Sequence, residues 1–252
     1  MSNIDLVRKG MDAILVSRDA AEVRKYFAED FIQHNPWSDD GMEHLLVLTE
    51  AGFGYEISRW VDDQDSQIVA YHGYYTAPNP LGDDPLVCVD MWRIANGLIQ
   101  EHWDILMVTP EAEKEALLAG GAESSASQGR HVAEMKRQAR AFLEGPVAGG
   151  DVDGIDRFVA ADAVTHLKSG ETNYGEMIKS YLRAGNRLST DVKRVLASGD
   201  LAFVHAHARF NDEEKALVDI FRFERGGKIV ESWSASQDIV PPEEAANSHP
   251  HF

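Results

Sequence analysis

An internal repeat constrains the fold of this sequence more than any other feature. The block VDMWRIANGLIQEHWD at residues 89–104 returns as VDIFRFERGGKIVESWS at residues 218–234. Both contain Val-Asp, an apolar residue, an aromatic residue and Arg, followed by a glycine turn, Ile and Glu-x-Trp. Self-similarity at a fixed period, here about 130 residues, marks repeated structural units, so we predict two copies of one small domain. Two further matches keep this order and spacing: residues 26–34 with residues 158–166, and His72 with His205.

The predicted boundary between the copies lies in a run of Gly, Ser and Ala residues. This composition is typical of a flexible linker, and we place the linker at residues 119–130. The first domain is then predicted at residues 1–118 and the second at residues 131–252. A chain of 252 residues has the length of two small domains.

Charge and composition exclude several classes of partner. The formal net charge is −18, which disfavours binding to nucleic acid phosphates or to anionic lipid. The single cysteine, Cys88, excludes an intrachain disulfide and a cysteine-based zinc site. The sequence contains no apolar stretch long enough to cross a membrane and no secretory signal pattern, so we expect a cytoplasmic protein.

Hydrophobic periodicity predicts helices followed by strands within each copy. In the first copy, residues 4–16, 20–29 and 41–51 have helical spacing, whereas residues 55–62, 67–76, 86–94 and 98–108 resemble strands. Asn96-Gly97 is a strong hairpin signal between the last two strands. Helices that precede strands indicate an α+β fold, with about three helices packed on a curved antiparallel sheet in each copy.

Alternation along the last two strands brings ionisable side chains to one face of the sheet. Asp90 and Trp92 share a face of their strand, and His102 and Asp104 share a face of the next. The hairpin allows Asp90 to approach the other two polar residues. A His beside a carboxylate can act as a general base, so we predict a pocket beneath the helices with these residues in its wall.

The repeated blocks, together with FIQHNP at residues 31–36, resemble the SnoaL-like branch of the nuclear transport factor 2-like superfamily, which includes polyketide cyclases and ketosteroid isomerase. The resemblance covers most of both copies. It implies a cone-shaped α+β domain with a deep central pocket. It also implies pairing through the outer sheet faces, either within the chain as a pseudo-dimer or between two chains.

The resemblance implies a catalytic Asp or His that projects from the sheet into the pocket. We therefore expect His102 as general base, Asp104 or Asp90 as the carboxylate that orients it, and His34 as a donor to the oxyanion. Further side chains are expected to contact the ligand: His72, Trp37, Tyr74 and Trp92 in the first copy, and His166, His205, His207 and Asp219 in the second.

The second copy departs from this pattern. Ser232 replaces His102, Ser234 replaces Asp104, and Leu167 replaces Asn35. The second copy has thereby lost the predicted base and its partner. It is expected to be a degenerate structural mate of the first copy or a site for a different ligand.

The expected function is that of a small-molecule enzyme without cofactor. It would be an isomerase, cyclase or aldol-type lyase that acts on a carbonyl-bearing, partly apolar substrate. The alternative is a non-catalytic ligand-binding or assembly module with the same fold. A metal site is a third hypothesis, with ligands from His34, His72 and His102 together with Asp90 or Asp104, or from the His205 and His207 pair.

Overall fold

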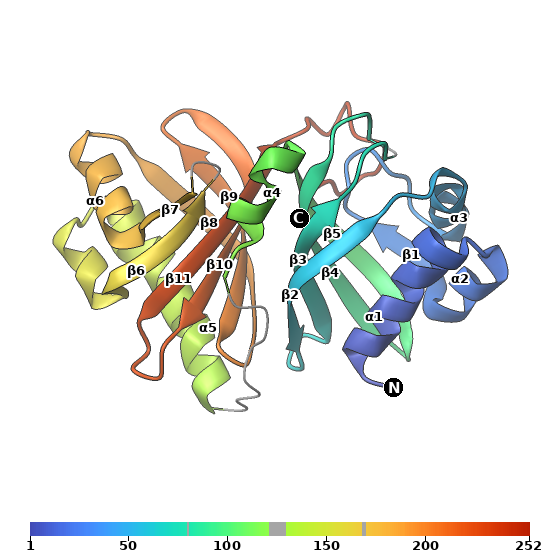
Figure 1. Cartoon of the computed structure of the whole chain (residues 1–252), viewed down its shortest axis with the longest axis horizontal. Coiled ribbons are helices and arrows are strands. Elements are labelled where there is room, and N and C mark those ends of the chain that lie inside the picture. Colours follow the sequence, from blue (N-terminus) through green and yellow to red (C-terminus); the bar gives the residue numbers. More distant parts are fainter. Residues whose placement is uncertain (80, 121–129, 168–169) are drawn as a thin grey trace. The chain divides into compact units, whose positions relative to one another are not determined.

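The computed structural model describes residues 1–79, 81–120, 130–167 and 170–252. Contacts divide the chain into two units, one formed by Met1–Glu111 together with Val240–Phe252 and the other by Ala112–Ile239. Each unit has its own sheet, helices and core, and both are α+β (Figure 1). Most of the predicted linker, residues 121–129, lies outside the described residues.

Three helices begin the first unit, in the regions where the sequence predicts them. Ser2 caps the first helix, because its hydroxyl accepts from the Asp5 N–H at 3.1 Å while the Asp5 side chain bonds the Ser2 N–H. Asp19 caps the second helix by accepting from the Ala21 N–H at 2.8 Å. The bounds are α1 Asn3–Asp12, extended by a π-helical turn at Ala13–Ser17, α2 Ala20–Tyr26 and α3 Met42–Ala51.

The first sheet has five strands, in the order β1-β5-β4-β3-β2. Strand β1 was not predicted, because its phenylalanines at positions 27 and 31 also fit helical spacing. It pairs in parallel with β5, whereas the other neighbouring strands are antiparallel. The bounds are β1 Phe27–Gln33, β2 Tyr55–Asp63, β3 Ile68–Tyr75, β4 Leu86–Ala95 and β5 Leu98–Val108.

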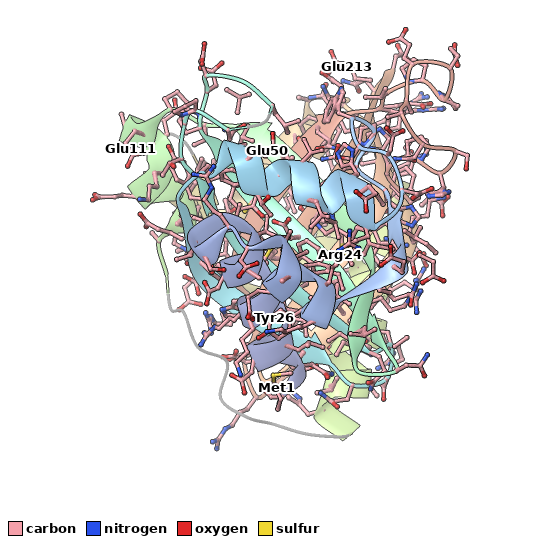
Figure 2. All side chains as sticks on the ribbon, turned by 90° about the vertical axis from the view of Figure 1, so that its right-hand side faces the viewer. Met1, Arg24, Tyr26, Glu50, Glu111 and Glu213 are labelled. Carbon is pink, nitrogen blue, oxygen red and sulfur yellow. The ribbon has the colours of Figure 1, made fainter. Side chains whose placement is uncertain are left out.

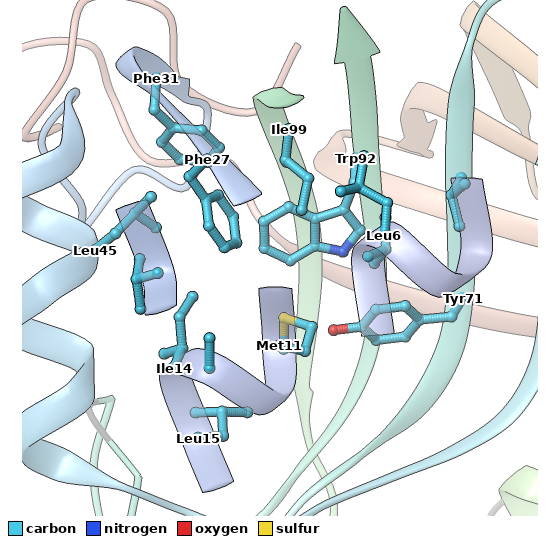
Figure 3. Close-up of a cluster of buried hydrophobic side chains, with 14 of the residues drawn as sticks. Leu6, Met11, Ile14, Leu15, Phe27, Phe31, Leu45, Tyr71, Trp92 and Ile99 are labelled. Atoms are coloured by element: carbon cyan, nitrogen blue, oxygen red, sulfur yellow. The ribbon is translucent and has the colours of Figure 1, made fainter. Parts of the chain in front are cut away.

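The core of the first unit lies between the helices and the inner face of this sheet. Phe27 packs edge-on against Trp92 of β4, with ring centroids 6.0 Å apart. Met11 of α1 lies near Tyr71 of β3, and Ile14 faces the same cluster (Figure 3). Figure 2 looks onto the helical side of this unit, with Met1 at the start of α1. The helices therefore cover the sheet face on which the sequence places Asp90, Trp92 and His102.

The second unit repeats the strand order of the first and adds one edge strand. Its sheet runs β7-β6-β11-β10-β9-β8, and β6 pairs in parallel with β11 as β1 does with β5. Apart from β7, the order corresponds to β1-β5-β4-β3-β2. The bounds of the strands are β6 Val159–Leu167, β7 Gly170–Asn173, β8 Leu188–Ser198, β9 Leu201–Phe210, β10 Glu213–Phe223 and β11 Ile229–Asp238.

Two helices of the second unit, Arg130–Phe142 and Tyr174–Arg183, pack on the corresponding face of its sheet. They bury a core that includes Phe142, Tyr174 and Phe221. None of the described helices is long and apolar enough to cross a membrane. The bounds are α4 Glu111–Leu118, α5 Arg130–Phe142, a π-helical turn at Leu143–Val147, a 3-10 turn at Asp153–Arg157 and α6 Tyr174–Arg183.

Candidate functional site

The first unit encloses a cavity of about 270 Å³ between its helices and its sheet. This volume is near the lower end of the range for small-molecule sites. Apolar side chains from α1, α3 and the sheet form most of the wall, and polar residues form the rest. The polar lining residues are Gln33, Asn35, Ser38, His44, Tyr75, Asn79, Asp90, His102 and Asp104.

Strand register brings three ionisable side chains of the cavity together. Asp90 lies directly opposite Asp104, and Trp92 lies directly opposite His102, on the antiparallel pair β4 and β5. Residues two apart on a strand share a face, so Asp90, His102 and Asp104 all point into the cavity. Their nearest donor and acceptor atoms lie within 4.8 Å of one another.

Both ring nitrogens of His102 are engaged in hydrogen bonds. Nδ1 lies 2.9 Å from Gln33 Oε1, which also accepts from the Asn35 N–H at 3.0 Å. The bond from the Asn35 N–H identifies this atom as the amide oxygen, which can only accept, so Nδ1 of His102 carries a hydrogen and donates it. Nε2 lies 3.0 Å from Asp90 Oδ1, and the ring stacks on Trp92 with centroids 3.7 Å apart. One proton is therefore shared between Nε2 and Asp90.

Asp90 also accepts a hydrogen bond from a tyrosine. The Tyr75 hydroxyl donates to Asp90 Oδ1 at 2.9 Å, and the Tyr71 hydroxyl lies 2.6 Å from that of Tyr75. Burial, together with the Asp90 charge, raises the pKa of both tyrosines well above the usual value, so both stay neutral. The other carboxylate oxygen, Asp90 Oδ2, is buried without a hydrogen-bond partner in the described part of the chain.

Among the residues that line the cavity, Asp104 is the one best suited to proton transfer. Burial raises the pKa of Asp104 to about 6, and the Asp90 charge adds to the rise. His102 and a hydrogen bond from Asn35 Nδ2 to Asp104 Oδ2, at 2.7 Å, oppose it. Asp104 Oδ1 is buried and accepts no hydrogen bond from any described residue. Asp104 lines the cavity, and a carboxylate with one oxygen free of hydrogen bonds can take a proton.

His34 does not line the cavity, although the sequence suggested it as a donor there. Strand β1 continues the alternation of the sheet, so Gln33 and Asn35 point inward and His34 points to the opposite face. There His34 Nε2 lies 2.9 Å from Glu101 Oε1, and its ring stacks on Trp103. Burial lowers the pKa of His34, and the hydrogen bond to Glu101 opposes that change.

Two further residues expected at the ligand also lie on this opposite face. His72 and Tyr74 alternate with Tyr71 and Tyr75 along β3, and His72 accepts a hydrogen bond from Arg59. A ligand set of His34, His72 and His102 is therefore not assembled. Trp92 and Trp37 do line the cavity, as expected, and the Trp37 side chain is half exposed.

The cluster of Asp90, His102 and Asp104 is not arranged to bind a metal ion. His102 has no free nitrogen lone pair while Nδ1 donates to Gln33 and Nε2 shares a proton with Asp90. Asp104 is likewise bonded through one oxygen to Asn35. The arrangement is that of a hydrogen-bonded proton network, which is what general acid–base chemistry needs.

In the second unit, the predicted residues divide in the same way. Asp219 occupies the position of Asp90, and burial raises the pKa of Asp219 to about 6 while a hydrogen bond from Ser234 opposes the rise. The three histidines lie on the opposite face of the sheet. Each has a charged neighbour there: His166 bonds Glu231, His205 bonds Arg194 and His207 bonds Glu214.

Sequence reasoning missed six polar residues of the cavity lining, and three of them, Gln33, Asn35 and Tyr75, lie on a strand or directly after one. Gln33 and Asn35 escaped because β1 was not recognised as a strand, and alternation could not be applied to it. Tyr75 was missed because β3 is buried along its whole length, so its sequence shows no contrast between faces. Extending the strand pattern through FIQHNP would have placed Gln33 and Asn35 beside His102.

Comparison with known families identifies one domain type. Residues 139–232, which lie in the second unit, match the SnoaL-like domain. No curated protein sequence matches the chain.

Several solved structures resemble about two fifths of the chain, at low identity. An LEH-like epoxide hydrolase from M. tuberculosis is 17% identical over 42% of this chain and 84% of its own, with a TM-score of 0.38. A proposed ketosteroid isomerase from Kribbella flavida DSM 17836 is 18% identical over 44% and 83%, with a TM-score of 0.38. IdmH from Streptomyces antibioticus, a proposed polyketide cyclase, is 20% identical over 40% and 91%, with a TM-score of 0.34. The domain match shows a SnoaL-like domain in the second unit, and the first unit shares the α+β architecture and the strand order of the second.

Proposed function

We propose that the first unit is an acid–base enzyme that moves a proton next to a carbonyl group of a small, partly apolar substrate. The observation that supports this most is the buried carboxyl of Asp104. Asp104 lines the cavity next to His102 and Asp90, and one of its oxygens has no hydrogen-bond partner among the described residues. Two groups that can take and give a proton therefore face one small apolar cavity.

The proposed step is balanced within the cavity. Asp104 Oδ1 removes a proton from the carbon beside the carbonyl, and the electrons of that C–H bond form an enolate. The proton shared by His102 and Asp90 stabilises the charge on the enolate oxygen. Return of a proton to another carbon gives isomerisation, whereas attack of the enolate carbon on a second carbonyl gives an aldol-type cyclisation. Neither outcome requires a cofactor.

The proposal gives the role of base to Asp104, although His102 was the first candidate from the sequence. His102 cannot accept a proton at Nδ1, which already donates to Gln33, and Nε2 is bonded to Asp90. The half-exposed Trp37 and the exposed Val47 and Leu81 belong to the cavity lining and offer an apolar surface to a substrate that enters.

Deuterium exchange tests the shared step without knowledge of the natural substrate. Small ketones and β-keto esters are incubated with the protein in D2O, and loss of the α-proton signal is followed by NMR. We expect exchange above the buffer rate with the wild type, and exchange close to that of buffer with Asp104→Asn. Asp219→Asn, which removes the carboxyl with a raised pKa in the second unit, should keep the wild-type rate.

Two results would contradict the proposal: no exchange with any carbonyl compound of suitable size, or equal exchange in the wild type and Asp104→Asn. Saturable binding of such compounds without exchange would favour the alternative, a ligand-binding module. We further infer that the two units arose by duplication, from their common strand order and repeated blocks. Pairing through the outer sheet faces and a cytoplasmic location stay predictions.

A further inference from the structure

Residues 240–252 belong to the first unit, although they follow the second unit in the sequence. Their contacts are concentrated on residues 34–40, the connection between β1 and α3. The Ala246 N–H donates to Pro36 O at 2.8 Å, and the His251 N–H donates to His34 O at 2.8 Å. His34 Nδ1 donates to His249 O at 2.7 Å. This C-terminal segment is thus hydrogen-bonded along the backbone of the connection.

Asn247 makes the most specific of these contacts. Its side-chain amide donates to Asn35 O at 2.7 Å and to Ser38 O at 3.0 Å, and its Oδ1 accepts from the His249 N–H at 3.1 Å. The residue is 8% exposed, so these bonds are largely shielded from water. Two donors facing two carbonyl oxygens fit an amide, whereas an ionised carboxylate at this position would be repelled.

The connection held in this way carries residues of the cavity. Asn35 donates through Nδ2 to Asp104, accepts the Trp37 N–H on Oδ1 at 2.9 Å, and is bonded through its main-chain oxygen to Asn247. Trp37 and Ser38 line the cavity. The connection has no helix or strand of its own between residues 34 and 41, so its shape depends on such bonds.

We propose that residues 240–252 position the reactive cavity of the first unit, with Asn247 holding Asn35 so that its amide donates to Asp104. Asn247 is a positioning residue, because it touches the connection and not the cavity. The consequence is that the reactivity of Asp104 depends on a segment encoded after the second unit. The counterpart of Asn35 in the second unit is Leu167, which has no amide to be positioned.

The titration of Asp104 reports on this arrangement directly. A hydrogen bond to the ionised carboxylate lowers its pKa, so losing the bond from Asn35 should raise it. The full-length protein is labelled with 13C at the aspartate carboxyl groups. The Asp104 signal is then identified as the one absent from Asp104→Asn, and its titration is followed by NMR. The measurement needs no substrate, so its outcome is independent of the deuterium-exchange test. The catalytic relevance of the Asp104 pKa rests on the proposed function.

We expect Asn247→Ala to raise the pKa of Asp104 by about half a pH unit or more, as Asn35→Ala should. The double variant should show no further rise, since both changes remove one bond. Asn186→Ala is the matched control, because that side chain also bonds a main-chain oxygen, Tyr181 O, but belongs to the second unit. It should leave Asp104 unchanged.

If Asn247→Ala is not folded by circular dichroism, Asn247→Leu replaces it, since it keeps the size, removes the two donors and adds no charge. A rise of the Asp104 pKa in either Asn247 variant, together with recovery in Asn247→Gln, supports the positioning role. An unchanged Asp104 titration in a folded Asn247 variant would overturn it, because Asn35 would then be held without the segment. No rise in Asn35→Ala would also overturn it, by showing that the bond to Asp104 does not act on its charge.

Discussion

The two units agree on one face of their sheets and differ on the other. On the outer face, Glu101 bonds both His34 and Arg93, and Glu231 bonds both His166 and Arg222. The pairs Arg59–His72 and Arg194–His205 are likewise equivalent. On the inner face, His102 and Asp104 correspond to Ser232 and Ser234.

This difference separates the residues that maintain the fold from those that can carry chemistry. Even a partly buried ion pair is costly to break one partner at a time, so both units are constrained to keep it. Polar side chains on the inner face of the sheet are under no such constraint unless the cavity binds a ligand. The retained His–Glu–Arg network is therefore structural, and the group confined to the first unit is the candidate active site.

Removing the proposed base should have the largest effect and should be confined to one unit. Asp104→Asn is expected to lower the rate of α-proton exchange by about 10²–10⁴-fold, the usual contribution of a general base. Asp219→Asn should leave the rate unchanged, because the second unit lacks the His102 and Asp104 counterparts. NMR exchange rates of both variants, measured side by side, decide the point. A comparable loss in Asp219→Asn would place the reaction in the second unit.

Breaking the shared outer network should affect both units alike. Glu101→Ala leaves His34 and Arg93 without their carboxylate, and Glu231→Ala does the same to His166 and Arg222. Each change is expected to lower the free energy of unfolding by about 2–4 kcal/mol. Urea unfolding followed by circular dichroism measures it. If only one of the two variants is destabilised, the equivalence of the outer faces is not energetic.

The ionisation of Asp104 and Asp219 should be visible in the pH dependence of the free energy of unfolding. The pKa of Asp104 is about 6 in the folded chain, above its ordinary value of 3.8, so the folded state binds the proton more tightly than the unfolded state. The contribution of Asp104 to the free energy of unfolding is fully present below its unfolded-state pKa of 3.8 and is lost as pH rises through about 6. Asp104→Asn should therefore raise the free energy of unfolding by about 1–3 kcal/mol at pH 7.5 and hardly at pH 4.

The matched variant Asp219→Asn should stabilise in the same pH range, because burial raises the pKa of that carboxyl as well. The gain should be of similar size, since the pKa of Asp219 is also raised to about 6. Unfolding curves at both pH values measure the gain. A uniform effect at pH 4 and pH 7.5 would show that packing, and not ionisation, determines the stability of these variants. We expect both variants to be stabilised, but only Asp104→Asn to lose α-proton exchange. This result would show that the raised pKa comes from burial in both units, whereas the reaction depends on Asp104.

The sequence predicts the architecture better than the position of individual side chains. Asp90, His102 and Asp104 were placed correctly on one face, because alternation and an Asn-Gly hairpin depend on local spacing alone. His34 was placed on the wrong face, because the parallel pairing of β1 with β5 joins segments about 70 residues apart and leaves no local signal. The contacts of Asn247 with Asn35 could not be predicted either, since they join residues 212 positions apart.

The smallest expected effect comes from a substitution that removes from the first unit a hydroxyl that the second unit lacks. Tyr75 donates to Asp90, whereas Ala208 at the equivalent position of β9 has no hydroxyl. Tyr75→Phe removes the donor and keeps the ring, which should lower the free energy of unfolding by about 1 kcal/mol. The proton shared by Asp90 and His102 would then lose one of its fixed neighbours, so α-proton exchange should fall by roughly fivefold. Asp104 should titrate as in the wild type, because Tyr75 does not contact it. A shift of the Asp104 titration in Tyr75→Phe would instead show that the two carboxyls behave as one coupled group, and that the base cannot be assigned to Asp104 alone.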